Sequence, residues 1–255
     1  MSKKNVIIKV NNLKKSYNGF QAVKGVTFEV FENEIFGILG PNGAGKTTTV
    51  EMMEGIRRID SGDIEIDNID IDKYPARAKH ILGIQLQEAD YFDHLNLKEL
   101  IELFGEFYGN KSDATTLLKR VELESKWKSM IKQLSGGQKQ RLSILLTLVS
   151  NPKILFLDEP TTGLDPQARR LMWDFIRELR DEGKTIILTT HYMEEAELLC
   201  DRIAIMDNGE ILKLGAPNDL IDDLLKKGFK KEVVQKAANL EDVFLDLTGK
   251  RLRDK

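Results

Sequence analysis

Hydrophobic and polar positions alternate along three stretches in the first part of the chain. This period of two runs through residues 6 to 10, 26 to 30 and 63 to 71. Alternation of this kind is typical of strands with one buried face, so these stretches predict a small antiparallel sheet. Between them lies EIFGIL, residues 34 to 39, a continuous apolar run that predicts a strand buried on both faces.

The period changes to that of a helix near residue 97. Apolar residues recur at helical spacing from Leu97 to Phe107, and further helical patterns continue to about Lys132. The pattern therefore predicts an inserted all-helical subdomain over about residues 90 to 150.

After the insertion, apolar strands alternate with helices. Strands are predicted at residues 153 to 158, 185 to 190 and 202 to 214, the last with a hairpin turn at Asn208-Gly209. Helices are predicted from Pro166 to about Glu182 and from about Met193. Such alternation predicts a doubly wound, mostly parallel sheet with right-handed crossovers.

Composition narrows the class of protein. The chain has 255 residues, 41% of them hydrophobic, and a formal net charge of −3, which argues against a surface built for nucleic acid. Its single cysteine, Cys200, cannot form an internal disulfide, and the first residues show no signal peptide, so we expect a cytoplasmic protein. The apolar runs are shorter than the roughly 18 residues that a membrane span requires.

The segment GPNGAGKT, residues 40 to 47, carries the clearest chemistry. It fits the pattern G-x-x-x-x-G-K-[ST] between a buried strand and a potential helix. Gly43 and Gly45 allow successive N–H groups to face one phosphate, Lys46 supplies a cation, and the Thr47 hydroxyl can bind Mg²⁺. The sequence therefore predicts an α/β phosphate-loop NTPase core with an N-terminal antiparallel β subdomain.

Two carboxylates end the predicted strand ILFLDEP, residues 154 to 160. Asp158 would lie beside the phosphates, where it can hold Mg²⁺ through water. The charge of Glu159 would repel the γ-phosphate, so its position there indicates a chemical role. We interpret Glu159 as the group that orients and deprotonates an attacking water.

Six motifs occur together and in order: GPNGAGKTT, Gln87 in GIQLQ, LSGGQ at residues 134 to 138, ILFLDEP, TTGLD at residues 161 to 165, and His191 after TIILTT. The set covers nearly the whole chain and resembles the ATPase subunit of ABC transporters. The resemblance implies ATP and Mg²⁺ as cofactors and a head-to-tail dimer, of two copies or with a paralogue. In such a dimer the LSGGQ segment of one chain covers the ATP of the other, so it needs no lysine of its own.

Roles follow from the resemblance residue by residue. Tyr17 would stack on adenine, Gln87 would bind Mg²⁺ beside the water, and His191 would contact the γ-phosphate. The implied catalytic residues are Glu159, His191, Gln87 and Lys46, and the implied metal ligands are Thr47, Gln87 and Asp158. The implied nucleotide-binding residues are Tyr17, Gly40, Pro41, Asn42, Gly43, Ala44, Gly45, Lys46, Thr47, Thr48, Ser135, Gly136, Gly137, Gln138 and Asp165.

Within the family, the stretches after His191 and near the C-terminus resemble the branch that serves multidrug, antibiotic and lipid-linked exporters. We therefore expect an ATP-hydrolysing subunit at the cytoplasmic face of the membrane, bound to a separate polytopic membrane subunit. Residues 88 to 92 and the helix with Phe104 and Phe107 are predicted to contact that subunit.

The predicted domains are an ATPase domain, residues 1 to 220, and a short helical tail, residues 221 to 255, with an apolar face formed by Leu240, Val243, Phe244 and Leu247. The alternative function is that of a non-transport ABC ATPase with soluble partners. A chromosome-maintenance ATPase would need a long coiled-coil insertion, and about 90 residues without sustained heptads separate the phosphate loop from LSGGQ.

Overall fold

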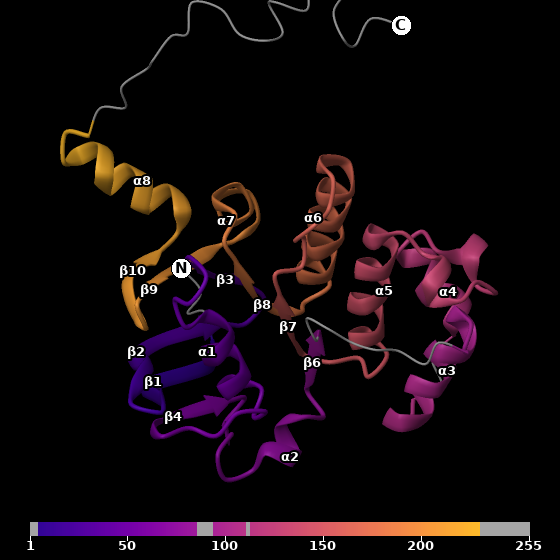
Figure 1. Ribbon diagram of the computed structural model, residues 1–255, viewed down its shortest axis with the longest axis horizontal. Helices are drawn as coiled ribbons and strands as arrows, with labels where there is room; N and C mark the ends of the chain where they lie inside the picture. The colour runs from indigo at the N-terminus through magenta and orange to yellow at the C-terminus, as the bar shows by residue number, and fades with distance from the viewer. Residues whose placement is uncertain (1–4, 86–93, 111–112, 230–255) are drawn as a thin grey trace, which may run out of the picture. The chain divides into compact units, whose positions relative to one another are not determined.

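The computed structural model describes residues 5–85, 94–110 and 113–229 (Figure 1). The chain divides into two compact units, Met1–Leu220 and Ile221–Lys255. The first unit contains all the strands described here. Of the second, the structure describes residues 221–229, which continue helix α8 (Pro217–Lys226) and end beyond it. The apolar face predicted around Leu240 lies outside the described residues.

The first unit is built on a six-stranded sheet in the order β10-β9-β3-β8-β7-β6. The strands are β10 (Glu210–Gly215), β9 (Arg202–Asp207), β3 (Ile35–Leu39), β8 (Thr185–Thr190), β7 (Ile154–Asp158) and β6 (Leu82–Gln85). All neighbours pair in parallel except β10 and β9, which form the predicted hairpin with positive φ at both turn residues, 48° at Asn208 and 81° at Gly209. The predicted α/β fold with a parallel sheet is confirmed.

The continuous apolar runs are the central strands. Every residue of β3, β7 and β8 is buried. Successive side chains point to opposite faces, so Ile186 and Leu188 pack in one hydrophobic cluster and Ile187 packs in another. The sheet therefore lies between two cores, one on each face.

A second sheet covers one of these cores. It has four antiparallel strands in the order β2-β1-β4-β5: β2 (Phe20–Phe31), β1 (Val6–Tyr17), β4 (Ser61–Ile66) and β5 (Ile69–Asp70). Phe28 of this sheet stacks on Phe36 of the main sheet, with ring centroids 5.1 Å apart. The same core includes the apolar residues of α1 (Lys46–Met53) and Ala78 of α2 (Pro75–Ala78).

Helices form the other core. Between β6 and β7 the described elements are α3 (Leu97–Tyr108), α4 (Ala114–Arg120), the 3₁₀ turns Glu124–Lys126 and Ile131–Gln133, and α5 (Gly136–Leu148). They pack with α6 (Pro166–Asp181) and α7 (Met193–Leu199) over the main sheet (Figure 1). The predicted helical insertion is therefore present.

Two strands of the structure differ from those that the hydrophobic pattern predicts. β1 extends to Tyr17 although alternation ends near residue 10, because its second half pairs with β2 around irregularities near Asn12 (φ 44°). β6 is not predicted, because it is a four-residue strand interrupted by Gly83. A Cβ at Gly83 would lie 2.8 Å from both Leu155 and Pro152 side-chain atoms, so this strand packs without a side chain there.

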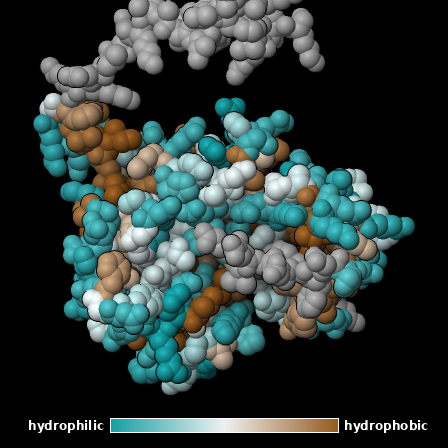
Figure 2. All heavy atoms as spheres, viewed as in Figure 1, coloured by the Kyte–Doolittle hydropathy of each residue, from teal (hydrophilic) through white to brown (hydrophobic). Residues whose placement is uncertain are grey.

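The surface shown in Figure 2 is mainly hydrophilic. Among the described residues, no helix combines the length and the hydrophobicity that crossing a membrane would require.

The topology brings distant segments to one edge. β3, β8 and β7 are adjacent and parallel, so their carboxyl ends lie side by side. The loop of residues 40–45 follows β3, His191 follows β8, and Asp158 and Glu159 end β7. Open parallel sheets bind ligands outside the carboxyl ends of their strands, so this edge is where a site is expected.

Candidate active site

The loop between β3 and α1 lines a cavity of about 490 Å³. Gly43 and Gly45 adopt positive φ of 81° and 97°, which glycine reaches without strain. A Cβ at Gly45 would lie only 2.6 Å from the Ala22 carbonyl oxygen, so the loop also requires glycine for space. The cavity is lined by Tyr17, Phe20, Ala22, Asn42, Gly43, Gly45, Lys46, Thr47, Thr48 and Glu159.

Lys46 is held inside this loop rather than extended into solvent. Its ammonium donates hydrogen bonds to the carbonyl oxygens of Gly40 at 2.9 Å and Pro41 at 3.1 Å, and it lies 3.9 Å from Glu159 Oε1. Burial lowers the pKa of Lys46, whereas the charges of Glu159 and Asp158 raise it. The cation is therefore fixed by its own loop at the wall of the cavity.

Asp158 and Thr47 form an oxygen-rich pair beside Lys46. Thr47 Oγ1 donates to Asp158 Oδ2 at 3.4 Å, and Thr189 Oγ1 donates to the other carboxylate oxygen. Burial raises the pKa of Asp158, and the Glu159 charge adds to this rise, while the two hydroxyl contacts and Lys46 oppose it. Hydroxyl and carboxylate oxygens are the ligands that Mg²⁺ prefers, so this pair fits a magnesium site.

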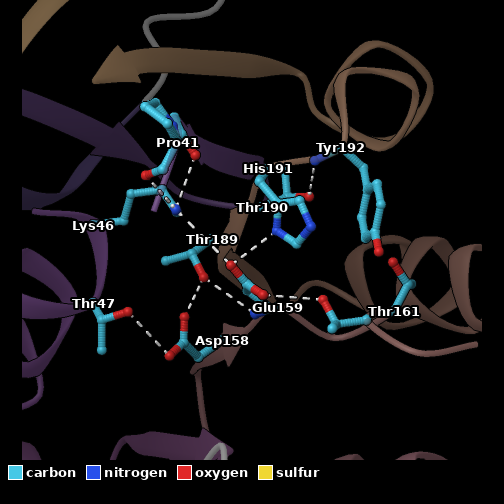
Figure 3. A network of polar contacts seen from close by, with 12 residues as sticks. Pro41, Lys46, Thr47, Asp158, Glu159, Thr161, Thr189, Thr190, His191 and Tyr192 are labelled. Carbon is cyan, nitrogen blue, oxygen red and sulfur yellow. Dashed lines mark hydrogen bonds and ion pairs between the residues drawn. The ribbon is translucent and has the colours of Figure 1, made fainter. Parts of the chain in front are cut away.

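Glu159 pairs with His191 across the carboxyl ends of β7 and β8 (Figure 3). His191 Nδ1 lies 3.0 Å from Glu159 Oε1, and Thr162 Oγ1 donates to Glu159 Oε2 at 3.0 Å. The backbone of Glu159 has φ of 48°, an uncommon conformation for a residue with a side chain, and its N–H donates to Thr189. A carboxylate beside an imidazole in a phosphate-binding cavity can accept a proton from water.

Two aromatic side chains, Tyr17 and Phe20, line the cavity of the phosphate loop. Tyr17, at the end of β1, was singled out by the sequence, and its ring lies near the cations of Lys15 and Arg57, at 5.6 and 5.3 Å. Phe20, at the start of β2, was not singled out, although it is 67% exposed and lines the same cavity. An aromatic residue directly after the Asn18-Gly19 turn was the available signal.

The LSGGQ segment lies at a different cavity of the same chain. Ser135 caps α5 through a capping box, in which Ser135 N–H donates to Gln138 Oε1 at 3.0 Å and Ser135 Oγ accepts from Gln138 N–H at 3.4 Å. A cavity of about 380 Å³ is lined here by Ser135, Gly136, Gly137, Gln138 and Asp165, among others. It shares no lining residue with the cavity of the phosphate loop.

The remaining predicted residues are placed as follows. Asp165 caps α6 by accepting from the N–H groups of Gln167 and Ala168, both at 2.9 Å. The carbonyl oxygens of Gly40 and Pro41 accept the hydrogen bonds of Lys46, and Ala44 is buried. Gln87 and residues 88 to 92 lie outside the described residues.

These features define a class of protein, the phosphate-loop NTPases. At the carboxyl edge of a parallel sheet, the glycine-rich loop lies beside four side chains: Lys46, Thr47, Asp158 and Glu159.

The comparisons give the family. The model of the ABC transporter family, ABC_tran, matches residues 23–162. The chain is 36% identical to the Nod factor export ATP-binding protein I of Paraburkholderia xenovorans (strain LB400), over 97% of this chain and 98% of that protein. It is 40% identical to the linearmycin resistance ATP-binding protein LnrL of Bacillus subtilis (strain 168), over 86% and 72%. A dimeric post-hydrolysis structure of the ATP-binding cassette MJ0796 bound to ADP and Pi has a TM-score of 0.75 and 28% identity, over 83% and 99%.

The chain belongs to the ABC transporter family and is an ATP-binding subunit of it. The predictions of an ABC ATPase, of ATP hydrolysis and of the exporter branch are thereby confirmed.

Proposed function

We propose that this chain is the motor of an exporter, that it binds ATP with Mg²⁺ in the cavity of the phosphate loop, and that Glu159 activates the water that attacks the γ-phosphate. The observation that carries the proposal is the pairing of Glu159 with His191 at the wall of the cavity that contains Lys46. A general base contributes about 10²- to 10⁴-fold to a rate when it is correctly placed.

His191 has two tasks in this scheme. Its Nδ1 contacts Glu159, which fixes the direction of the carboxylate, and its second ring nitrogen remains to contact the γ-phosphate. Lys46 neutralises charge on the phosphates from the loop, and the N–H groups of the loop and of the start of α1 face the same anion.

Thr47 and Asp158 would hold Mg²⁺, together with Gln87. The described residues contain no group of three or more His, Cys, Asp or Glu that could hold a metal by itself. Mg²⁺ is commonly bound through one or two carboxylates and completes its shell with phosphates and water, so a larger cluster of acidic residues is not required. When bound, the ion would neutralise charge on the transferred phosphate, and its own charge would lower the pKa of Asp158.

Two copies of the chain, or this chain and a paralogue, would form composite sites. The separate cavity at LSGGQ and Asp165 supports this, because it shares no lining residue with the cavity of the phosphate loop yet contains a helix N-terminus suited to an anion. The dimeric cassette with which this chain shares its fold supports the same arrangement.

The membrane partner and the cargo are proposed from the relatives. The matched proteins are named for Nod factor export and for linearmycin resistance, which supports a drug, antibiotic, peptide or lipid-like cargo moved outward. We place this chain at the cytoplasmic face of the membrane, attached through a separate polytopic subunit.

Hydrolysis is tested with Glu159→Gln. We expect kcat for ATP to fall by about 10²-fold or more while the affinity for ATP is retained, because the carboxamide cannot accept the proton of water. Glu194→Gln, an exposed glutamate on α7, is the control for charge removal and should hydrolyse ATP at the wild-type rate. Equal rates for Glu159→Gln and wild type would contradict the assigned role.

The partner is tested by purifying the chain from its native cells in mild detergent and identifying the proteins bound in stable ratio. A polytopic membrane protein among them supports the exporter. Recovery with soluble proteins alone would favour a non-transport ATPase instead.

A further inference from the structure

Glu195 is a buried carboxylate for which the mechanism above has no use. It lies on α7 with no exposed surface. Its Oε1 accepts two hydrogen bonds, from Thr161 Oγ1 at 2.7 Å and from Trp173 Nε1 at 3.0 Å. Its Oε2 has no hydrogen-bond donor among the described residues. Burying an acid with one unpartnered oxygen destabilises a protein. We therefore ask which segments the two hydrogen bonds of Glu195 connect.

Glu195 joins the two segments that carry the reacting pair. Thr161 follows Glu159 by two residues in the loop after β7. On the other side, the first turn of α7 connects Glu195 to His191, since the Ala196 N–H donates to the Tyr192 carbonyl oxygen at 3.2 Å. The Thr161–Glu195 hydrogen bond is therefore a short connection between the Glu159 loop, residues 159–165, and the start of α7, which directly follows the His191 loop, residues 191–192.

The backbone of Glu159 explains why such a connection is useful. A side-chain-bearing residue with φ of 48° costs of the order of 1–3 kcal/mol and persists only where its surroundings hold it. On its N-terminal side, this backbone is held by the Glu159 N–H, which donates to the hydroxyl and to the carbonyl oxygen of Thr189. After Glu159, it is held by Thr162, whose N–H donates to the Glu159 carbonyl at 3.1 Å, and by the bond from Thr161 to Glu195.

We propose that Glu195 is a positioning residue for ATP hydrolysis: by binding the Thr161 hydroxyl, it holds the Glu159 loop against the His191 loop and keeps the Glu159 carboxylate aimed at its partner. This inference rests on the roles proposed above for Glu159 and His191. It assigns Glu195 no contact with ATP, so its loss should change kcat and leave ATP binding intact.

The test compares two variants that each remove one of the two donors to Glu195 Oε1. Thr161→Val removes the hydroxyl in a side chain of the same shape, and Thr161→Ser keeps it. Trp173→Phe removes the indole N–H, which comes from α6 and not from the loop of Glu159. ATPase kinetics of the full chain are measured for all three, beside wild type and Glu159→Gln, with thermal unfolding by circular dichroism.

We expect Thr161→Val to lower kcat about tenfold, as the loss of one positioning hydrogen bond would, with KM for ATP within about twofold. Thr161→Ser should recover most of this loss. Trp173→Phe should lower the unfolding temperature while kcat stays within about twofold. Wild-type kcat in Thr161→Val, or an equal loss in Trp173→Phe, would overturn the inference, since the second result would show general loosening.

Should Thr161→Val fail to fold, Glu195→Gln and Glu195→Ala provide the same comparison. Gln keeps an oxygen acceptor for the Thr161 hydroxyl. The Glu195→Gln variant should therefore hydrolyse ATP at least about fivefold faster than the Glu195→Ala variant. Equal rates would again overturn the inference. Glu159→Gln separates the two levels: wild-type activity in that variant removes the proposed role of Glu159 itself, whereas an inactive Glu159→Gln beside an active Thr161→Val removes only the role of Glu195.

Discussion

Glu54, at the end of α1, should make the stability of this protein fall as the pH rises. It is 5% exposed, and its burial raises its pKa from 4.5 to about 8, with further contributions from the charges of Asp158 and Glu51. The folded chain therefore keeps the Glu54 proton over a pH range in which the unfolded chain releases it.

The sign and size follow from proton linkage. Below pH 4.5 both states are protonated at this site, and Glu54 does not alter the free energy of unfolding. Between pH 4.5 and about 8 only the unfolded state ionises, so this free energy falls by about 1.4 kcal/mol per pH unit. The full loss is at most about 5 kcal/mol above pH 8.

The perturbation that exposes this effect is Glu54→Gln, which has the same shape and no titration. Urea unfolding of wild type and variant is followed by circular dichroism from pH 5 to pH 8.5, without nucleotide and with EDTA. We expect the variant to gain on wild type steadily as the pH rises. Glu102→Gln, on the exposed surface of α3, is the control and should differ from wild type by about 0.5 kcal/mol or less at every pH. A constant difference between Glu54→Gln and wild type across this range would refute the reasoning.

Three further predictions concern single contacts. Gly45→Ala should weaken ATP binding at least about tenfold in titration calorimetry, because the loop would have to move its backbone away from the Ala22 carbonyl oxygen, and an unchanged affinity would contradict this. Asp113→Ala should lower the free energy of unfolding by about 1 kcal/mol, because Asp113 caps α4 through the N–H groups of Thr115 and Thr116. Asp113→Asn keeps an oxygen that can cap the helix, so it should retain most of this stabilisation. Gly37→Ala should destabilise by about 1–3 kcal/mol, because the new Cβ would lie 2.6 Å from Cys200 Sγ; Cys200→Ala in the same chain should recover part of the loss, and additive effects would exclude this clash as the cause.

The sequence predicts which residues the structure brings together around the phosphate loop, because phosphate-binding chemistry restricts residue types. Only glycine tolerates the backbone at Gly43 and Gly45 without strain, and the strand-end rule places Asp158, Glu159 and His191 at one edge once β3, β7 and β8 are assigned as parallel strands. The apolar runs made that assignment possible, since each of these strands is buried on both faces.

Buried acids could not be predicted from the sequence. Glu195 follows Glu194 in the same helix, and the two have the same side chain, yet Glu194 is exposed and Glu195 is enclosed by Thr161 and Trp173. Glu51 in α1 and Glu54, which directly follows that helix, present the same problem. Which glutamate faces inward depends on residues far away in the sequence, so neither local composition nor the period of the helix distinguishes them.

The order of the strands has a consequence for synthesis of the chain. β3 lies between β8 and β9, and both of these neighbours are made more than a hundred residues after it. At about 5–20 residues per second, the ribosome would take roughly 7 to 30 s to proceed from the phosphate loop to β8. During that interval the loop is present without β8, β9 and His191, and for most of it without Glu159 as well. A nascent chain should therefore acquire tight ATP binding only when its last third has emerged, and bound nucleotide would report that the sheet is complete.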